Sequence, residues 1–162
     1  MKYFLSLGSN SGNREKNLEA ALIRMKWQGM RILLNSFFYE TEPVAMPNEA
    51  WFLNQVVEVD TEMAPADLLV WIKKTEATMG RDLTEKYKSR VIDIDILLAE
   101  DSVIQTDELQ IPHPKLTERN FVLVPFAEIA PEITHPVLHK KIYDLLMDSK
   151  DPHKVRIINE SR

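Results

Sequence analysis

The spacing of hydrophobic positions along the chain predicts strands that alternate with helices. Residues 3–7 form a short apolar run that ends in a Gly-Ser-Asn turn, which is typical of a strand. Residues 30–39 and 52–60 are two further predicted strands, and the two prolines between them indicate a loop. Residues 90–98 are rich in β-branched side chains and predict a fourth strand.

Two helices fit between these strands. The first would be capped by Ser11 or Asn13, and its apolar positions have helical spacing: Leu18, Ala21, Leu22 and Met25. The second begins at Pro65 and ends at Gly80, and its predicted buried positions are Leu68, Leu69, Ile72 and Ala77. Beyond these elements we expect a short strand at 102–105 and helices at 120–129 and 143–147.

The order of these elements predicts a single α+β domain over residues 1–162. Strand, helix, strand, strand, helix and strand follow one another, and a short C-terminal appendage comes last. Because two neighbouring strands have no helix between them, an antiparallel sheet is favoured over a doubly wound one. We therefore expect a ferredoxin-like βαββαβ core with helices packed on the sheet.

Composition and charge narrow the classes of function. The 162 residues are 44% hydrophobic, enough for a sizeable core, and the net charge of −5 disfavours binding to nucleic acid or to an anionic membrane. The chain has no cysteine, which excludes disulfides, thiolate-bound metals and thiol catalysis. No apolar run approaches the ~18 residues of a membrane span. A cytoplasmic location without an obligate protein partner is therefore expected.

Two aspartates in the last predicted strand of the core suggest a metal site. Side chains alternate along a strand, so Asp93 and Asp95 share one face. Ile92, Ile94, Ile96 and Leu98 are then expected on the other face. Two carboxylates on one face repel each other unless a cation lies there, and Mg²⁺ commonly brings substrate phosphates with it. A solvated acidic face on an edge strand is the alternative.

Basic and aromatic residues near these aspartates add two candidate chemistries. The basic set comprises Arg81, Lys86, Lys88, Arg90, His113, Lys115 and Arg119. Cations beside metal-binding carboxylates suit polyphosphate transfer, although surface ion pairs would look the same. Phe52 with Asn54, and Phe121 with its polar neighbours, could hold a flat heterocycle between two rings, or could simply belong to the core. No Walker A loop is present.

Eight segments in chain order resemble the 6-hydroxymethyl-7,8-dihydropterin pyrophosphokinase family. They are residues 7–10 (LGSN), 39–44 (YETEPV), 52–58 (FLNQVVE), Glu76 with Gly80-Arg81, 90–98 (RVIDIDILL), 111–116 (IPHPKL), 118–125 (ERNFVLVP) and 128–131 (EIAP). The family transfers pyrophosphate from ATP to the hydroxymethyl group of the pterin, releasing AMP, in folate biosynthesis. Its fold is ferredoxin-like, which agrees with the element order above.

The resemblance also implies roles for particular residues. Asp93 and Asp95 would bind two Mg²⁺ ions that bridge the ATP phosphates. Asp95 is a candidate acceptor of the pterin hydroxyl proton, and a metal-bound alkoxide is the alternative. The residues implied in pterin binding are Thr41, Pro43, Val44, Phe52, Asn54 and Phe121, with Tyr87 folding over the site in place of the family's usual Trp. The residues implied in ATP binding are Glu76, Arg81, Arg90, His113 and Arg119. Of these, Arg81 and Arg90 would also stabilise charge during transfer.

Two other functions remain compatible with the residues alone. A Mg²⁺-dependent phosphohydrolase would need the same two carboxylates but no pair of aromatic rings. A ferredoxin-like module that binds a small ligand without chemistry would not need two aspartates on one strand face.

Overall fold

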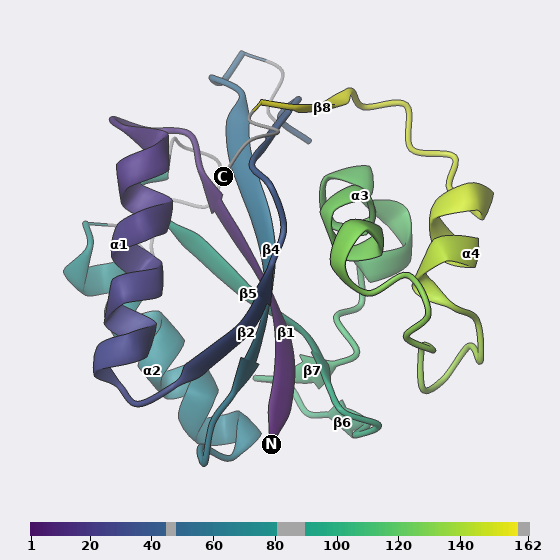
Figure 1. The fold of residues 1–162 in the computed structure, drawn as a ribbon, viewed down its shortest axis with the longest axis horizontal. Helices are drawn as coiled ribbons and strands as arrows, with labels where there is room; N and C mark the ends of the chain where they lie inside the picture. Colours follow the sequence, from purple (N-terminus) through teal and green to yellow (C-terminus); the bar gives the residue numbers. More distant parts are fainter. Residues whose placement is uncertain (45–47, 81–89, 159–162) are drawn as a thin grey trace.

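A six-stranded antiparallel sheet separates two layers of helices (Figure 1). The computed structural model describes residues 1–44, 48–80 and 90–158. The strands of the sheet are β1 (Lys2–Ser9), β2 (Arg31–Asn35), β3 (Tyr39–Thr41), β4 (Phe52–Asp60), β5 (Asp93–Ala99) and β8 (Val155–Ile157). One layer consists of α1 (Arg14–Trp27) and α2 (Pro65–Thr78), and the other of α3 (Asn120–Ile129) and α4 (Ile142–Asp148). None of the helices in the described ranges is long and apolar enough to cross a membrane.

The strand order confirms the ferredoxin-like core. Strands lie in the order β5-β1-β4-β3-β8, and β2 also pairs with β4. All these pairings are antiparallel, and β1 is hydrogen-bonded to β4 on one side and to β5 on the other. Strand β8 was not predicted from the sequence. The strands β6 (Ile104–Gln105) and β7 (Gln110–Ile111) form a separate hairpin, and a 3₁₀ turn follows at Leu116–Glu118.

The predicted strand at 30–39 is two strands, because the chain leaves the ladder at Ser36. The Ser36 hydroxyl accepts a hydrogen bond from the backbone N–H of Val56 at 3.0 Å, and the Ser36 carbonyl accepts one from the side chain of Gln55 at 2.8 Å. These bonds satisfy buried polar groups of β4 where the β2 ladder has ended. The break lets β3 start at Tyr39 and pair with the first residues of β4.

Two predicted buried positions need correction. Ala77 of α2 is exposed, and the neighbouring Thr75 and Glu76 are buried in its place. Leu98 lies with Leu97 on the α3 side of the sheet, not with the isoleucines of β5. The cause is an irregularity in the register of β1 and β5: Phe4 pairs with Leu98 but Leu5 pairs with Ile96, which leaves one extra residue in β5.

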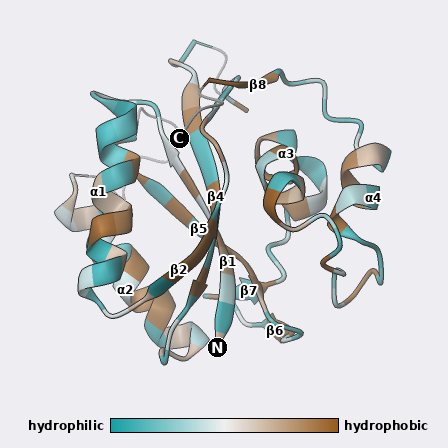
Figure 2. Cartoon of the chain, in the orientation of Figure 1, coloured by the Kyte–Doolittle hydropathy of each residue, from teal (hydrophilic) through white to brown (hydrophobic). Residues whose placement is uncertain are grey.

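The sheet carries a hydrophobic core on each face, and hydrophobic colours concentrate on its central strands (Figure 2). The first core lies against α1 and α2 and includes Leu5, Leu7, Leu18, Ile72 and Ile94. The second core lies against α3 and α4 and includes Phe4, Val56, Leu97, Leu123 and Phe126. Since α3 is packed on the sheet by this second core, its N-terminal turn has a fixed place beside the strands.

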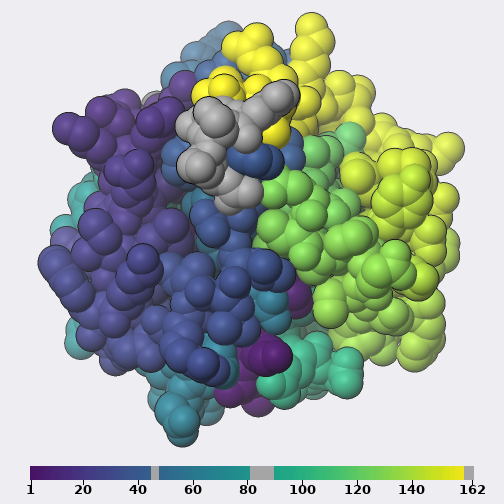
Figure 3. Space-filling view, in the orientation of Figure 1, coloured from purple at the N-terminus to yellow at the C-terminus, as the bar shows by residue number. Residues whose placement is uncertain are grey.

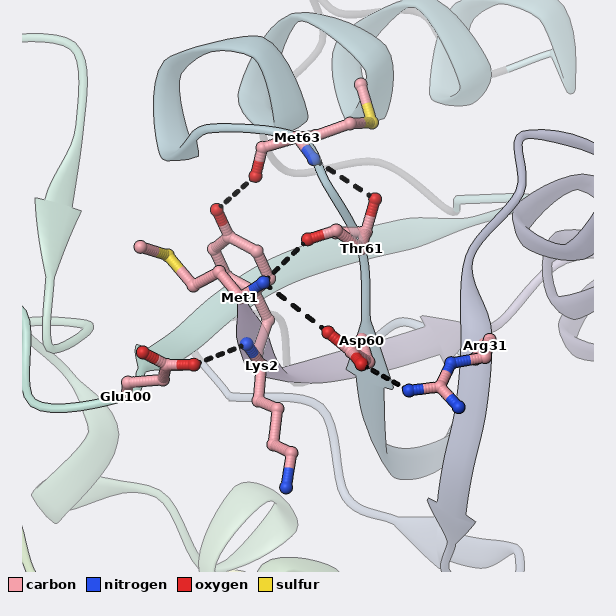
Figure 4. A network of polar contacts seen from close by, with 8 residues as sticks. Met1, Lys2, Arg31, Asp60, Thr61, Met63 and Glu100 are labelled. Atoms are coloured by element: carbon pink, nitrogen blue, oxygen red, sulfur yellow. Dashed lines mark hydrogen bonds and ion pairs between the residues drawn. The ribbon is translucent and has the colours of Figure 1, made fainter.

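Polar contacts hold the start of β1 against both of its neighbours (Figure 4). The amino group of Met1 donates to the Thr61 carbonyl at 2.8 Å and approaches Asp60 at 3.4 Å. The backbone N–H of Lys2 donates to the Glu100 carboxylate at 3.0 Å. These bonds pin β1 at the end opposite to Gly8 and Ser9.

The second core predicts the effect of removing an aromatic ring from α3. Phe126 is fully buried, and its ring lies 4.7 Å from that of Phe4. We expect Phe126→Ala to lower the free energy of unfolding by about 3–5 kcal/mol, because a buried ring is lost and a cavity remains. Urea denaturation measures this loss. The control Val70→Ala, at an exposed position of α2, should change stability by about 0.5 kcal/mol or less.

Candidate active site

A cavity of about 470 Å³ lies between the sheet and the N-terminal turn of α3. Its floor is formed by alternate residues of three adjacent strands: Ser6 and Gly8 of β1, Phe52 and Asn54 of β4, and Asp93 and Asp95 of β5. Its walls are formed by Thr41, Glu42, Val44, Arg90, Lys115, Glu118, Arg119 and Phe121. Because β1 lies between β4 and β5, aromatic, amide and carboxylate groups from distant parts of the chain meet in one cavity.

Asn54 is held at the floor by a contact that requires glycine on the neighbouring strand. Its Nδ2 donates to the Thr41 hydroxyl at 2.5 Å, and the side chain is buried. Gly8 pairs directly with Asn54, and a Cβ on Gly8 would lie 2.5 Å from Asn54 Oδ1. A glycine within a strand commonly marks such a close approach. The carboxamide orientation is therefore set by Thr41 on one side and by the absence of a side chain on the other.

Two aromatic rings face the same cavity, one from the sheet and one from α3. Phe52 is the first residue of β4, and Phe121 is the second residue of α3. Both side chains are half-buried, and the Arg119 guanidinium lies 5.5 Å from the Phe121 ring centre. This cation–π contact links a cationic wall residue to an aromatic one.

The carboxylates of Asp93 and Asp95 both line the cavity and are partly exposed, at 23% and 35% of their side-chain area. Arg90 Nη1 donates to Asp93 Oδ2 at 2.9 Å, which offsets part of the repulsion between the two acids. Among the described residues no group of three or more potential metal-binding side chains occurs. Two carboxylates with oxygen donors still fit Mg²⁺, because this ion usually takes its remaining ligands from water and substrate phosphates.

A second, smaller cavity of about 260 Å³ shares Asp95 with the first. His113 lines it, and burial, followed by the Arg119 charge, lowers the pKa of His113 to about 4 against the opposing effect of Asp93. At pH 7 the imidazole is therefore neutral, and its 4.0 Å approach to Asp95 is not an ion pair. Its Nδ1 accepts from the Lys115 N–H at 3.1 Å, so the proton of the neutral ring resides on Nε2.

Asn10 positions Arg90 and was not singled out as a site residue from the sequence. Its Oδ1 accepts from the Arg90 N–H at 2.6 Å, and its Nδ2 donates to the Ala50 carbonyl at 3.1 Å. The buried side chain thus joins the turn after β1 to the residues before β4 and β5. Ser6, Gly8, Glu42 and Glu118 of the cavity were also missed. The alternation of β1 places Ser6 and Gly8 on one face, but the sequence does not say which strands flank them.

The structure brings most of the predicted site residues together. Thr41, Val44, Phe52, Asn54, Arg90, Asp93, Asp95, Arg119 and Phe121 line the first cavity, and His113 lines the second. Pro43 is buried and lies between the lining residues Glu42 and Val44 in the sequence, but it does not itself line the first cavity. Glu76 lines neither cavity: it is 3% exposed, and its Oε2 accepts from the backbone N–H of Ile94 at 2.9 Å. Arg81 and Tyr87 lie outside the described residues.

Comparison with known proteins decides the family. Residues 4–131 match the model of the family described as 7,8-dihydro-6-hydroxymethylpterin-pyrophosphokinase (HPPK). The chain belongs to the HPPK family. This match includes every predicted site residue and ends before α4 and β8.

Named relatives agree with this family. The "2-amino-4-hydroxy-6-hydroxymethyldihydropteridine pyrophosphokinase" of Aquifex aeolicus is 39% identical over 139 residues, which are 86% of this chain and 86% of that protein. The "Folic acid synthesis protein FOL1" of Dictyostelium discoideum is 42% identical over 84% of this chain. The matched region is only 20% of that relative's length, so the chain spans about a fifth of it.

The HPPK fold is also found among solved structures. The crystal structure of Plasmodium falciparum HPPK-DHPS wild type with SDX-DHP superposes with a TM-score of 0.75 at 20% identity. The superposition covers 90% of this chain and 44% of that one. At this identity the likeness supports the shared fold.

The contact between Gly8 and Asn54 predicts a coupled pair of substitutions. Gly8→Ala should lower the free energy of unfolding by about 1–3 kcal/mol, because the new methyl group overlaps the carboxamide. In an Asn54→Ala background the same substitution should cost much less, since the overlapping atoms are gone. Urea denaturation of the four proteins in this cycle measures the coupling. Equal losses in both backgrounds would contradict the assigned contact.

Proposed function

We propose that the chain transfers pyrophosphate from ATP to the hydroxymethyl group of 6-hydroxymethyl-7,8-dihydropterin, with release of AMP, in folate biosynthesis. The observation that carries this proposal is the single cavity in which a carboxylate pair, two arginines, two phenylalanines and a buried asparagine meet. A phosphohydrolase would use only the charged half of this cavity. A binding module without chemistry would not need the aspartate pair.

The pterin occupies the part of the cavity between Phe52 and Phe121 in this proposal. A flat heterocycle gains apolar burial and stacking from the two rings. Asn54 offers an amide to the donor and acceptor groups at the pterin edge, and its bond to Thr41 holds the amide in place. Pro43 and Val44 shape the neighbouring wall, and Tyr87 would cover the bound ring.

The triphosphate of ATP occupies the charged side in this proposal. Arg90 and Arg119 line it, and the neutral His113 presents an Nε2–H from the adjoining cavity. Arg81 would add a further cation. Glu76 lies outside the cavity and accepts a hydrogen bond from the backbone N–H of Ile94, the residue between the two aspartates in β5. We assign it a positioning role for ATP and the metal ligands.

Asp93 and Asp95 would hold two Mg²⁺ ions in the proposed complex, and bound Mg²⁺ supplies charge neutralisation for the phosphates. The pterin hydroxyl oxygen forms a bond to the β-phosphorus, and the bond from that phosphorus to the α-phosphate oxygen breaks. In this proposal Asp95 would accept the hydroxyl proton, and AMP leaves with the oxygen. Arg81 and Arg90 stabilise the charge that moves to the leaving group.

One incubation distinguishes the three functions. The purified protein is mixed with ATP and Mg²⁺, with and without hydroxymethyldihydropterin, and nucleotides are separated by ion-exchange chromatography. AMP formed only in the presence of pterin supports the proposed transfer. Release of ADP or phosphate without pterin indicates a hydrolase, and unchanged ATP in both samples indicates a binding module.

Removal of either aspartate should abolish turnover without unfolding the protein. We expect Asp93→Ala and Asp95→Ala to lose at least about 90% of the rate, equivalent to ~1.4 kcal/mol of barrier. Relief of carboxylate repulsion should keep the melting temperature near that of the wild type. The control Asp101→Ala removes an exposed carboxylate just after β5 and should leave the rate unchanged. Retention of more than about a tenth of the rate in either site variant argues against the metal role.

Substitution of Phe121 should weaken mainly the binding of pterin, and substitution of Arg119 should weaken mainly the binding of ATP. Phe121→Ala is expected to weaken pterin binding much more than ATP binding, because stacking contributes about 1 kcal/mol beyond area burial. Arg119→Ala should weaken binding of an ATP analogue more than that of pterin. Calorimetry with a non-hydrolysable ATP analogue, and with pterin in its presence, measures both. Equal losses of both ligands in Phe121→Ala would mean that the ring only stabilises the domain.

A further inference from the structure

The C-terminal segment, residues 149–157, contacts both walls of the cavity described above. It leaves α4 and runs to the edge of the sheet, where it ends as β8 (Figure 1). In the space-filling view it lies along the upper edge of the molecule, from the α3–α4 half toward the sheet (Figure 3). The whole segment lies beyond residues 4–131, the range matched by the family.

At one end the segment caps α3 through Asp151. The first N–H groups of a helix have no partner inside it, and the cap residue of α3, Arg119, supplies no side-chain bond. Asp151 Oδ2 accepts from the Asn120 N–H at 2.8 Å, and the Asp151 carbonyl accepts from the Asn120 side chain at 3.2 Å. Asn120 stands directly between the two cavity residues Arg119 and Phe121.

Asp151 is itself firmly held. Its side chain is 4% exposed, and its Oδ1 accepts from the His153 N–H at 3.0 Å and contacts the His153 imidazole at 2.5 Å. Ser149 completes the group by donating its hydroxyl to Asn120 Oδ1 at 2.6 Å. Burial alone would raise the pKa of Asp151, but the N–H groups of Asn120 and His153 outweigh it, so the pKa is lowered and the carboxylate is ionised at neutral pH.

At its other end the segment pairs with the opposite wall. The Glu42 N–H donates to the Lys154 carbonyl at 3.0 Å, and the Lys154 N–H donates to the Glu42 carboxylate at 2.7 Å. Val155 then pairs with Thr41 in the ladder between β8 and β3. Thr41 and Glu42 both line the cavity, and Thr41 holds the Asn54 amide.

We propose that residues 149–157 form a brace that sets the separation of the two cavity walls, with Asp151 as a positioning residue for the flat heterocyclic substrate. The brace fixes the turn that carries Phe121 relative to Thr41, the last residue of β3, and to Glu42, which follows it. This inference rests on the proposed function for the identity of that substrate. A displacement of about 1 Å in a positioned group is enough to impair an enzyme strongly. The bonds of Asp151 therefore matter for pterin binding although Asp151 does not line the cavity.

Kinetics of Asp151 variants test the brace. Asp151→Ala should raise the KM for pterin by about fivefold or more and change the KM for ATP by less than about twofold. Asp151→Asn keeps an acceptor for the Asn120 N–H and should restore part of the loss. The control Asp148→Ala removes an exposed carboxylate of α4 that pairs only with Lys140 in the described contacts, and it should match the wild type. Unchanged or equally raised KM values in Asp151→Ala would overturn the proposal.

Amide hydrogen exchange tests the same brace without substrates. Asp151→Ala removes the acceptor of the Asn120 N–H, so that amide must exchange faster in any case. If residues 149–157 act as one unit, the Glu42 amide, whose partner is the distant Lys154 carbonyl, also exchanges faster. Acceleration limited to Asn120 and His153 would show two independent anchors and overturn the brace. Should Asp151→Ala not fold, Ser149→Ala must show the same coupling.

The two tests separate failure of the brace from failure of the proposed function. If the wild-type protein produces no AMP with pterin, the proposed function is wrong. The amide hydrogen exchange of Glu42 in Asp151→Ala then tests the brace by itself. If the wild-type protein is active and Asp151→Ala has an unchanged KM for pterin, the brace is wrong and the proposed function stands.

Discussion

The site depends on the pairing of β1 with β4 and β5 at the same time. Side chains of a strand alternate between faces, so this pairing lines up every second residue of three strands on the α3 side. Gly8 then lies between Asn54 and Asp93, and Ser6 lies between Val56 and Asp95. A shift of one residue in either register would turn these groups into the apolar core and bring an apolar residue to the cavity in their place, Leu53 from β4 or Ile94 from β5.

The same constraint explains how polar groups are tolerated on a face that elsewhere forms a core. Toward the start of β1, the α3 side of the sheet is filled by Phe4, Val56 and Phe126. Toward its end the packing gives way to the cavity, and two of the polar side chains there pair with a neighbouring wall residue. Asn54 bonds to Thr41, and Asp93 pairs with Arg90. Because every such pair lies near the cavity, a ligand that enters it finds oriented polar groups and little need for rearrangement.

The sequence predicted the elements of the core well, and it failed where tertiary contacts decide. Periodicity and proline placed α1, α2 and the main strands, and the shared face of Asp93 and Asp95 followed from alternation alone. Leu98 was misplaced because a β-bulge depends on a partner strand that the local sequence does not reveal. Strand β8 was not predicted because three residues are too few to show a periodicity, and their strand conformation depends on pairing with the edge of β3. The resemblance to a family implied which residues bind metal and substrates, but only the order of strands in the sheet shows that these side chains lie together.

Charge distribution reconciles an acidic chain with the polyanionic substrate that we propose. The net charge is −5, yet three basic residues, Arg90, Lys115 and Arg119, all line the cavity. Glu40, which lies next to Thr41 but points away from the cavity lining, is neutralised separately by Arg14 and Arg156, whose hydrogen bonds lower its pKa. Acidic side chains near the site are thus either paired or placed where a divalent cation is expected. The local field in the cavity is therefore set by these arrangements, and the sign of the whole chain has little influence on it.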